Sequence, residues 1–105
     1  MNPPRVLIVD DEPTNILLAG FVLEADGFIV ASAADAQQAL AAIATCRPDL
    51  VLMDIQMPGT DGLTLTRRLK LDPATRQITV VAFTAYAMKG DEVRMRAAGC
   101  DGYIA

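Results

Sequence analysis

LVLMDIQMPG, residues 50–59, runs from four consecutive apolar residues into a single acid, Asp54, and then into a Met-Pro-Gly turn. A short, continuous apolar run indicates a strand covered on both faces, as in the parallel sheets of α/β proteins. Functional sites of such sheets lie beyond the carboxyl ends of the strands. The segment therefore predicts a buried strand that ends on an acid at a functional edge.

Short apolar runs alternate with amphipathic stretches along the rest of the chain. Besides 50–53, strands are expected at 6–9, 28–31, 78–83 and from 102 onward. Helices are expected from 13 to just before Gly27, at 36–45, at 62–71 and within 87–98. The last has Val93 and Ala97 as its apolar stripe, with Met88 near its start. Repeated strand–helix units of about 20–25 residues imply right-handed crossovers and a parallel, doubly wound α/β sheet.

The length and charge of the chain exclude several classes of protein. Its 105 residues suit one domain, and its net charge of −4 disfavours direct nucleic-acid binding, which needs clustered cations. Arg67, Arg68 and Lys70 are interpreted as a solvated helix face. No apolar run approaches a membrane span, and no signal peptide is visible, so a cytoplasmic location is expected.

The two cysteines, Cys46 and Cys100, form no CxxC motif, and the chain has no histidine. A zinc site is therefore not expected. Both thiols are predicted to be reduced, although the sequence leaves a disulfide open.

Acids follow two of the expected strands: Asp10 and Asp11 after the first, Asp54 after the third. Neighbouring parallel strands lie about 5 Å apart, so these side chains can converge. Each like-charged pair at about 4 Å costs on the order of 4 kcal/mol at an effective dielectric near 20. This repulsion either raises the pKa of one of the carboxyl groups or is relieved by a bound cation. Carboxylate oxygens suit a hard ion such as Mg2+.

A carboxylate beside such an ion can act as a nucleophile toward phosphorus, which makes Asp54 a candidate phosphoacceptor. The turn after Asp54 can aim a carbonyl, that of Gln56, at the metal. Thr84, at the end of the fourth strand, can donate to a phosphoryl oxygen or simply cap the next helix.

Four segments taken together resemble the receiver domain of two-component response regulators: Leu7–Glu12, Asp49–Gly59, Phe83–Ala85 and Ala98–Tyr103. They span nearly the whole chain in order and at fitting spacing. The resemblance implies a flavodoxin-like (CheY-like) five-stranded sheet of order 2-1-3-4-5.

The resemblance also implies roles for residues. Asp54 would accept a phosphoryl group from a phosphohistidine of a sensor kinase or a phosphotransfer protein. Asp11, Asp54 and the Gln56 carbonyl would hold Mg2+, and Asp10 would support the metal through water. The chain would then have no activity other than self-phosphorylation and autodephosphorylation at Asp54.

Thr84 and Tyr103 would form the switch pair of the family. On phosphorylation the Thr84 hydroxyl would move toward the phosphate and the Tyr103 ring would turn inward. The face formed by the fourth helix, fifth strand and fifth helix would rearrange and be read by a downstream protein effector. Gln56 and Tyr86 resemble the positions that tune autodephosphorylation.

The pattern departs from the family at one end, because the Lys-Pro and fifth helix of the family would follow Ala105. Residues 1–105 are therefore expected to be a receiver domain that is incomplete at its C-terminus. Leaving an apolar strip beside the first helix in water costs several kcal/mol at about 25 cal/mol per Å2. Self-association through this face is predicted, as is slow phosphotransfer if the lysine is absent.

Three alternatives remain open. A receiver fold that is never phosphorylated could act as a docking module, which the missing lysine favours. A haloacid-dehalogenase-type phosphatase would need a second acid where Gln56 stands. A flavodoxin-like nucleotide binder would need a Gly- or Ser/Thr-rich phosphate loop in place of Asp10-Asp11-Glu12.

Overall fold

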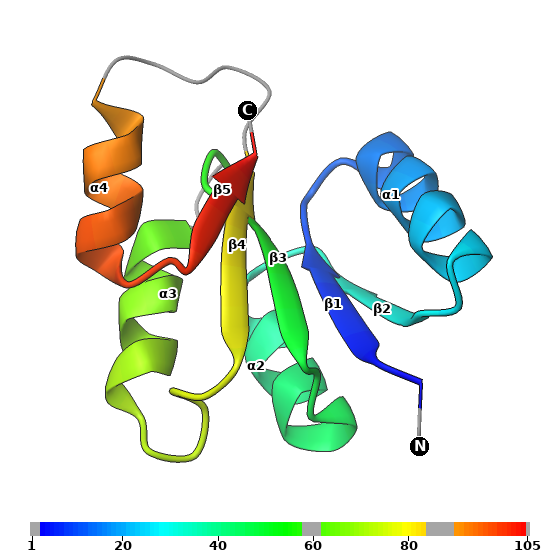
Figure 1. The fold of residues 1–105 in the computed structure, drawn as a ribbon, viewed down its shortest axis with the longest axis horizontal. Helices are drawn as coiled ribbons and strands as arrows, with labels where there is room; N and C mark the ends of the chain where they lie inside the picture. The colour runs from blue at the N-terminus through cyan, green and yellow to red at the C-terminus, as the bar shows by residue number, and fades with distance from the viewer. Residues whose placement is uncertain (1–2, 58–61, 84–89, 105) are drawn as a thin grey trace.

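Five short parallel strands form one sheet with helices on both of its faces (Figure 1). The computed structural model describes residues 3–57, 62–83 and 90–104. The strand order is β2-β1-β3-β4-β5, and every neighbouring pair is parallel. The expected fold class and strand order are thus confirmed.

The elements follow one another in strict alternation. They are β1 (Arg5–Val9), α1 (Pro13–Ala25), β2 (Ile29–Ala33), α2 (Ala36–Cys46), β3 (Leu50–Asp54), α3 (Gly62–Leu71), β4 (Thr79–Phe83), α4 (Asp91–Ala98) and β5 (Gly102–Ile104). Pro13 occupies the first turn of α1, where its missing N–H leaves no bond unmade. The Asp35 side chain caps α2 by accepting from the Gln38 N–H at 2.8 Å.

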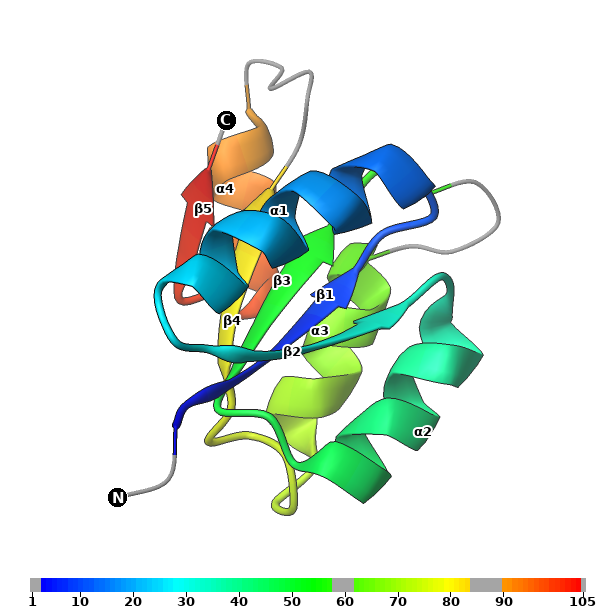
Figure 2. The same cartoon turned by 90° about the vertical axis from the view of Figure 1, so that its right-hand side faces the viewer.

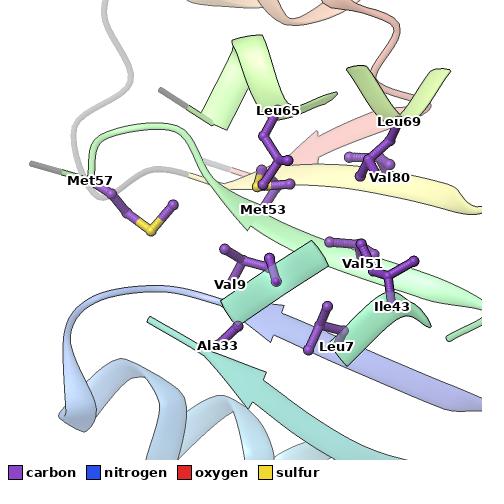
Figure 3. Packing of buried hydrophobic residues seen from close by; sticks show 11 residues of the cluster. Leu7, Val9, Ala33, Ile43, Val51, Met53, Met57, Leu65, Leu69 and Val80 are labelled. Carbon is purple, nitrogen blue, oxygen red and sulfur yellow. The ribbon is translucent and has the colours of Figure 1, made fainter. Parts of the chain in front are cut away.

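The helices are divided unequally between the faces of the sheet. Figures 1 and 2 show α1 on one face and α2, α3 and α4 on the other. The larger core cluster lies on the second face, where Leu65 and Leu69 of α3 pack over Met53 and Val80 (Figure 3). Aliphatic side chains fill this layer, which suits a chain without tryptophan.

The face covered by α1 is partly open. Gly20 is the one fully buried residue among those of α1, while large apolar side chains of this helix point to solvent. Ile104 of β5, on the same side of the sheet as its partner Phe83, is 57% exposed. We call this the open apolar face; its exposed members are Leu17, Leu18, Phe21, Val22 and Ile104. The prediction of an apolar strip in water beside the first helix is confirmed.

Two elements differ from expectation. β2 lies at Ile29–Ala33 rather than 28–31, because Ser32 and Ala33 continue the ladder opposite Ile8 and Val9. In α4 the core-facing residues are Met95 and Ala98, not Val93 and Ala97. The helix packs on α3 and β5 through Met95 and Ala98, which leaves Val93 71% exposed.

Lys70 is not part of a solvated face, contrary to its interpretation from sequence. Its Nζ donates to the Ile78 carbonyl and to Asp101 Oδ2, both at 2.7 Å, and to the Arg76 carbonyl at 3.3 Å. Asp101 Oδ2 also accepts from the Val80 N–H at 2.8 Å. This network joins α3 to the starts of β4 and β5, at the edge of the sheet away from Asp54.

Both cysteines are free, as predicted. Among the described helices, none is both long and apolar enough to cross a bilayer.

Candidate functional site

Three carboxyl groups meet at the carboxyl edge of the sheet. Asp10 and Asp11 directly follow β1, and Asp54 is the last residue of β3. Because Val9 pairs with Met53, the two strand ends lie side by side. One oxygen from each of the three carboxyl groups lies within 4.8 Å of the others. The expected convergence of the acids is therefore observed.

Asp54 is held in place by its own backbone. Its side chain is largely buried, and Oδ1 accepts a hydrogen bond from the Gln56 N–H at 2.9 Å. Met57 follows shortly after and is buried in the core, which anchors the chain beyond the acid (Figure 3). One oxygen of Asp54 is thus fixed by the turn.

Asp10 is wholly buried, and only one of its two carboxyl oxygens accepts a hydrogen bond. Its N–H donates to the Ala33 carbonyl at 3.0 Å, and its Oδ1 accepts from the Glu12 N–H at 2.9 Å. Its Oδ2 has no hydrogen-bond partner among the described residues. A buried acceptor left unpaired is destabilising by about 1–3 kcal/mol, and more when charged. This oxygen therefore favours a proton or a cation nearby.

The pKa of Asp54 is raised from 3.8 to about 6. Burial is the largest cause, and the negative charges of Asp10 and Asp11 add to it, while the hydrogen bond from Gln56 opposes it. At neutral pH the cluster carries strong mutual repulsion that a bound cation would relieve.

A divalent hard cation fits these donors. The cluster offers carboxylate oxygens alone, which suit Mg2+ or Ca2+ rather than the nitrogen and sulfur ligands that zinc prefers. Asp11 is exposed and Asp10 is buried, so the cluster reaches from the interior to the surface.

Gly62 helps to position Asp54, a role that the sequence analysis did not predict. It begins α3, and a Cβ at this position would overlap the Asp54 carbonyl oxygen and lie 3.0 Å from Ile55 Cα. The helix can therefore approach the backbone of the acid only because residue 62 has no side chain. A glycine placed at the start of the expected helix was the available signal.

Among the described residues, Tyr103 is not brought into the cluster. Thr84 and Tyr86 lie outside the described residues, although β4 ends beside Asp54 at Phe83. Tyr103 lies on β5 opposite Ala82 and is 41% exposed. The pKa of its hydroxyl is raised, chiefly through Glu92 of α4.

The sequence profile of the response regulator receiver domain matches residues 6–105. The chain belongs to this family. The polar-differentiation response regulator DivK of Brucella anthropi is 45% identical over 102 residues, which cover 97% of this chain and 83% of the relative. DivK of Brucella ovis is 44% identical over 99 residues, which cover 94% and 80%.

Solved structures agree with this assignment. A response regulator from Chloroflexus aurantiacus superposes with a TM-score of 0.92 at 33% identity, covering 98% of this receiver domain and 84% of that chain. The receiver domain of a sensor histidine kinase from Pseudomonas aeruginosa superposes with a TM-score of 0.86 at 32% identity, covering 98% and 84%. That structure has a magnesium ion coordinated in its active site cleft.

We predict that Gly62→Ala destabilises the receiver domain, because the added methyl group pushes α3 off the Asp54 backbone. Overpacking of this kind costs about 1–3 kcal/mol. Gly20→Ala in α1 is the matched control: the nearest atoms to its Cβ are 3.8 Å away, so it should be stabilising by about 0.5–1 kcal/mol. Urea denaturation measures both, and equal effects would contradict the proposed contact.

We also predict that the stability of the metal-free receiver domain falls between about pH 4 and pH 6. The raised pKa of Asp54 means that the native state binds the proton more tightly than the unfolded state, so the free energy of unfolding decreases as pH rises. The loss is on the order of 3 kcal/mol, since one pKa unit corresponds to about 1.4 kcal/mol.

Asp54→Asn removes this titration. Its stability relative to the parent should therefore grow from about pH 4 to pH 6 in denaturation curves measured with a chelator present. If the free energy of unfolding changed with pH in the same way in both proteins, Asp54 would not be the group that titrates. Added Mg2+ should stabilise the parent at pH 7 and the variant much less.

Proposed function

We propose that this receiver domain accepts a phosphoryl group on Asp54 in a two-component phosphorelay. The observation that supports this is the placement of Asp54: it is largely buried at a strand end, held on one side by Gln56, and lies beside two further carboxylates. An acid that served only solubility would not be placed among like charges in the interior.

The proposed reaction transfers phosphorus from nitrogen to oxygen. An oxygen of the Asp54 carboxylate attacks the phosphorus of a phosphohistidine, and the P–N bond breaks as the P–O bond forms. The electron pair of the broken bond stays on the imidazole nitrogen, which takes up a proton. A haloacid-dehalogenase-type phosphatase would need a second acid at the position of Gln56 to hydrolyse its aspartyl phosphate. Because Gln56 is not an acid, the aspartyl phosphate at Asp54 is the product of the proposed reaction.

The acidic cluster is the proposed Mg2+ site. Asp11, Asp54 and the Gln56 carbonyl would be the protein ligands, and Asp10 would act through a bound water. When bound, Mg2+ would supply positive charge that offsets the repulsion between the Asp54 carboxylate and an incoming phosphoryl group. The unpartnered Oδ2 of Asp10 is available to orient that water.

The proposed readout is a protein surface. The Thr84 hydroxyl would contact the phosphoryl group, and the ring of Tyr103 would turn inward from its exposed position on β5. Proposed partners are a sensor histidine kinase or histidine phosphotransfer protein upstream and a protein effector downstream. Gln56 and Tyr86 would set the rate of autodephosphorylation, and the site of action would be cytoplasmic.

Labelling with a small phosphodonor tests the proposal. Acetyl phosphate with Mg2+ should yield one phosphorylated species that is retarded on a Phos-tag gel. Asp54→Asn should abolish the shifted band, and Asp11→Asn should reduce it at least tenfold by weakening metal binding.

Glu24→Gln, which alters an exposed acid of α1, is the matched control and should label like the parent. A shifted band that survives Asp54→Asn would place the phosphoryl group elsewhere. A parent that never labels would instead favour a docking module that is not phosphorylated.

We propose further that two copies associate through the open apolar face. Leu17 and Phe21 are 72% and 76% exposed, and burying such side chains is favourable by about 25 cal/mol per Å2. Sedimentation velocity at tens of micromolar should show concentration-dependent association. Phe21→Glu should restore a monomer, whereas Leu71→Glu, at an 82% exposed residue of α3, should not. A clean monomer of the parent across this range would contradict the proposal.

A further inference from the structure

A buried hydroxyl group in α3 has no part in the proposed chemistry. Among the described residues, the buried polar or charged side chains are those of Asp10, Asp54 and Thr66, and of these Thr66 alone lies outside the acidic cluster. Thr66 is in the middle of α3 and is fully buried. Threonine is a weak helix former, and valine has nearly the same shape without a polar group to bury. Packing alone therefore does not account for a hydroxyl group at this position.

The hydroxyl group bonds to the turn of α3 that touches Asp54. Its Oγ1 donates to the Gly62 carbonyl at 2.8 Å, four residues earlier in the helix. Gly62 is the residue whose missing side chain lets α3 rest on the Asp54 backbone. A hydroxyl that bonds to a helical carbonyl one turn back changes the local bend of the helix. Thr66 is thus placed to set the direction in which the first turn of α3 meets Asp54.

The Thr66 hydroxyl is itself held by a second segment. The Cys100 thiol, in the turn before β5, donates to Thr66 Oγ1 at an Sγ–Oγ1 distance of 4.0 Å. Burial raises the pKa of this thiol, which keeps it protonated and able to donate, although a thiol is a weak donor. Thr66 Oγ1 therefore has a donor on one side and an acceptor on the other, which fixes its orientation.

Small displacements of Asp54 matter in the acidic cluster. One oxygen of Asp54 is bonded to the Gln56 N–H at 2.9 Å, so the direction of the side chain follows the backbone around it. The three carboxyl groups place oxygens within 4.8 Å of one another, and a tilt of this backbone changes the distances between them. Misplacing a reacting group by about 1 Å can cost on the order of 100-fold in rate.

We infer that Thr66 is a positioning residue for Asp54: its hydroxyl group fixes the first turn of α3 against the Asp54 backbone and so sets the place of this carboxylate in the acidic cluster. The inference rests on the proposed function, because it concerns the same Mg2+ site and the same phosphoacceptor. Thr66 acts through Gly62, and not by touching the ion or the phosphoryl group.

Three variants separate the hydroxyl group from the packing around it. Thr66→Val removes the hydroxyl and keeps the branched shape, whereas Thr66→Ser keeps the hydroxyl and removes the methyl group. Leu69→Val is the matched control, because Leu69 is buried in the core and packs over Val80 toward the other end of α3 (Figure 3). This control loosens the core without changing the turn that meets Asp54. Urea denaturation gives the stability of each protein.

Three further readouts are taken from each protein. The first is the amide resonances of Ile55 and Gln56 without metal, which report the backbone after Asp54. The second is the Kd for Mg2+ from calorimetry, and the third is the rate of labelling by acetyl phosphate at saturating Mg2+. Thr66→Val should move the resonances, weaken Mg2+ binding by about threefold to tenfold and slow labelling by a similar factor, as expected for the loss of one hydrogen bond. Thr66→Ser and Leu69→Val should match the parent in all three.

The outcomes separate this inference from the proposed function. If the parent binds Mg2+ and is labelled, and Thr66→Val matches it in all three readouts, the inference is overturned and the proposed function stands. Equal losses in Thr66→Ser would assign the effect to the methyl group, and equal losses in Leu69→Val would assign it to general loosening of the core; either result overturns the inference. If the parent is never labelled, the proposed function fails. Unmoved Ile55 and Gln56 resonances in Thr66→Val would then overturn the positioning role independently.

Discussion

The parallel pairing of β1 with β3 is the constraint on which the site depends. Because Val9 lies opposite Met53, the chain must deliver Asp10 and Asp54 to the same edge at neighbouring positions. The pairing of β1 with β3 cannot shift to separate these acids, because a slip of one residue would turn the buried side chains of a strand to the other face. The core residues of β1 and β3 hold this register against the repulsion, with Leu7, Val9, Val51 and Met53 fully buried.

Contacts at both ends of the strands hold the elements around this edge in place. Near the acids, Gly62 lets α3 rest on the backbone of Asp54, and the Gln56 N–H fixes one of its oxygens. At the far edge, Lys70 donates hydrogen bonds to the Ile78 carbonyl and to Asp101, which joins α3 to the starts of β4 and β5.

Much of this was predictable from local patterns. Continuous apolar runs predicted the strands, and the alternation of strands and helices predicted a parallel sheet with its acids on one edge. The pattern worked because parallel sheets covered on both faces leave a clear signature in single segments. The order of the strands came from resemblance to a family, since periodicity carries no information about which strands pair.

What escaped prediction involves contacts between distant segments. The end of β2 depends on pairing with Ile8 and Val9, and the burial of Met95 instead of Val93 depends on how α4 packs against α3 and β5. Lys70 was mistaken for a solvated cation because its acceptors lie in a later loop and in the turn before β5.

The central claim is that the carboxylates of Asp10, Asp11 and Asp54 form one cation site in which Asp54 is a ligand. Crystals of the protein soaked in Mn2+, which binds the same oxygen ligands as Mg2+ and scatters anomalously, test it directly. The account predicts an anomalous peak at about 2.0–2.3 Å from oxygens of Asp11 and Asp54, and no peak there in Asp54→Asn. A peak elsewhere, or an empty cluster at millimolar Mn2+, would contradict it.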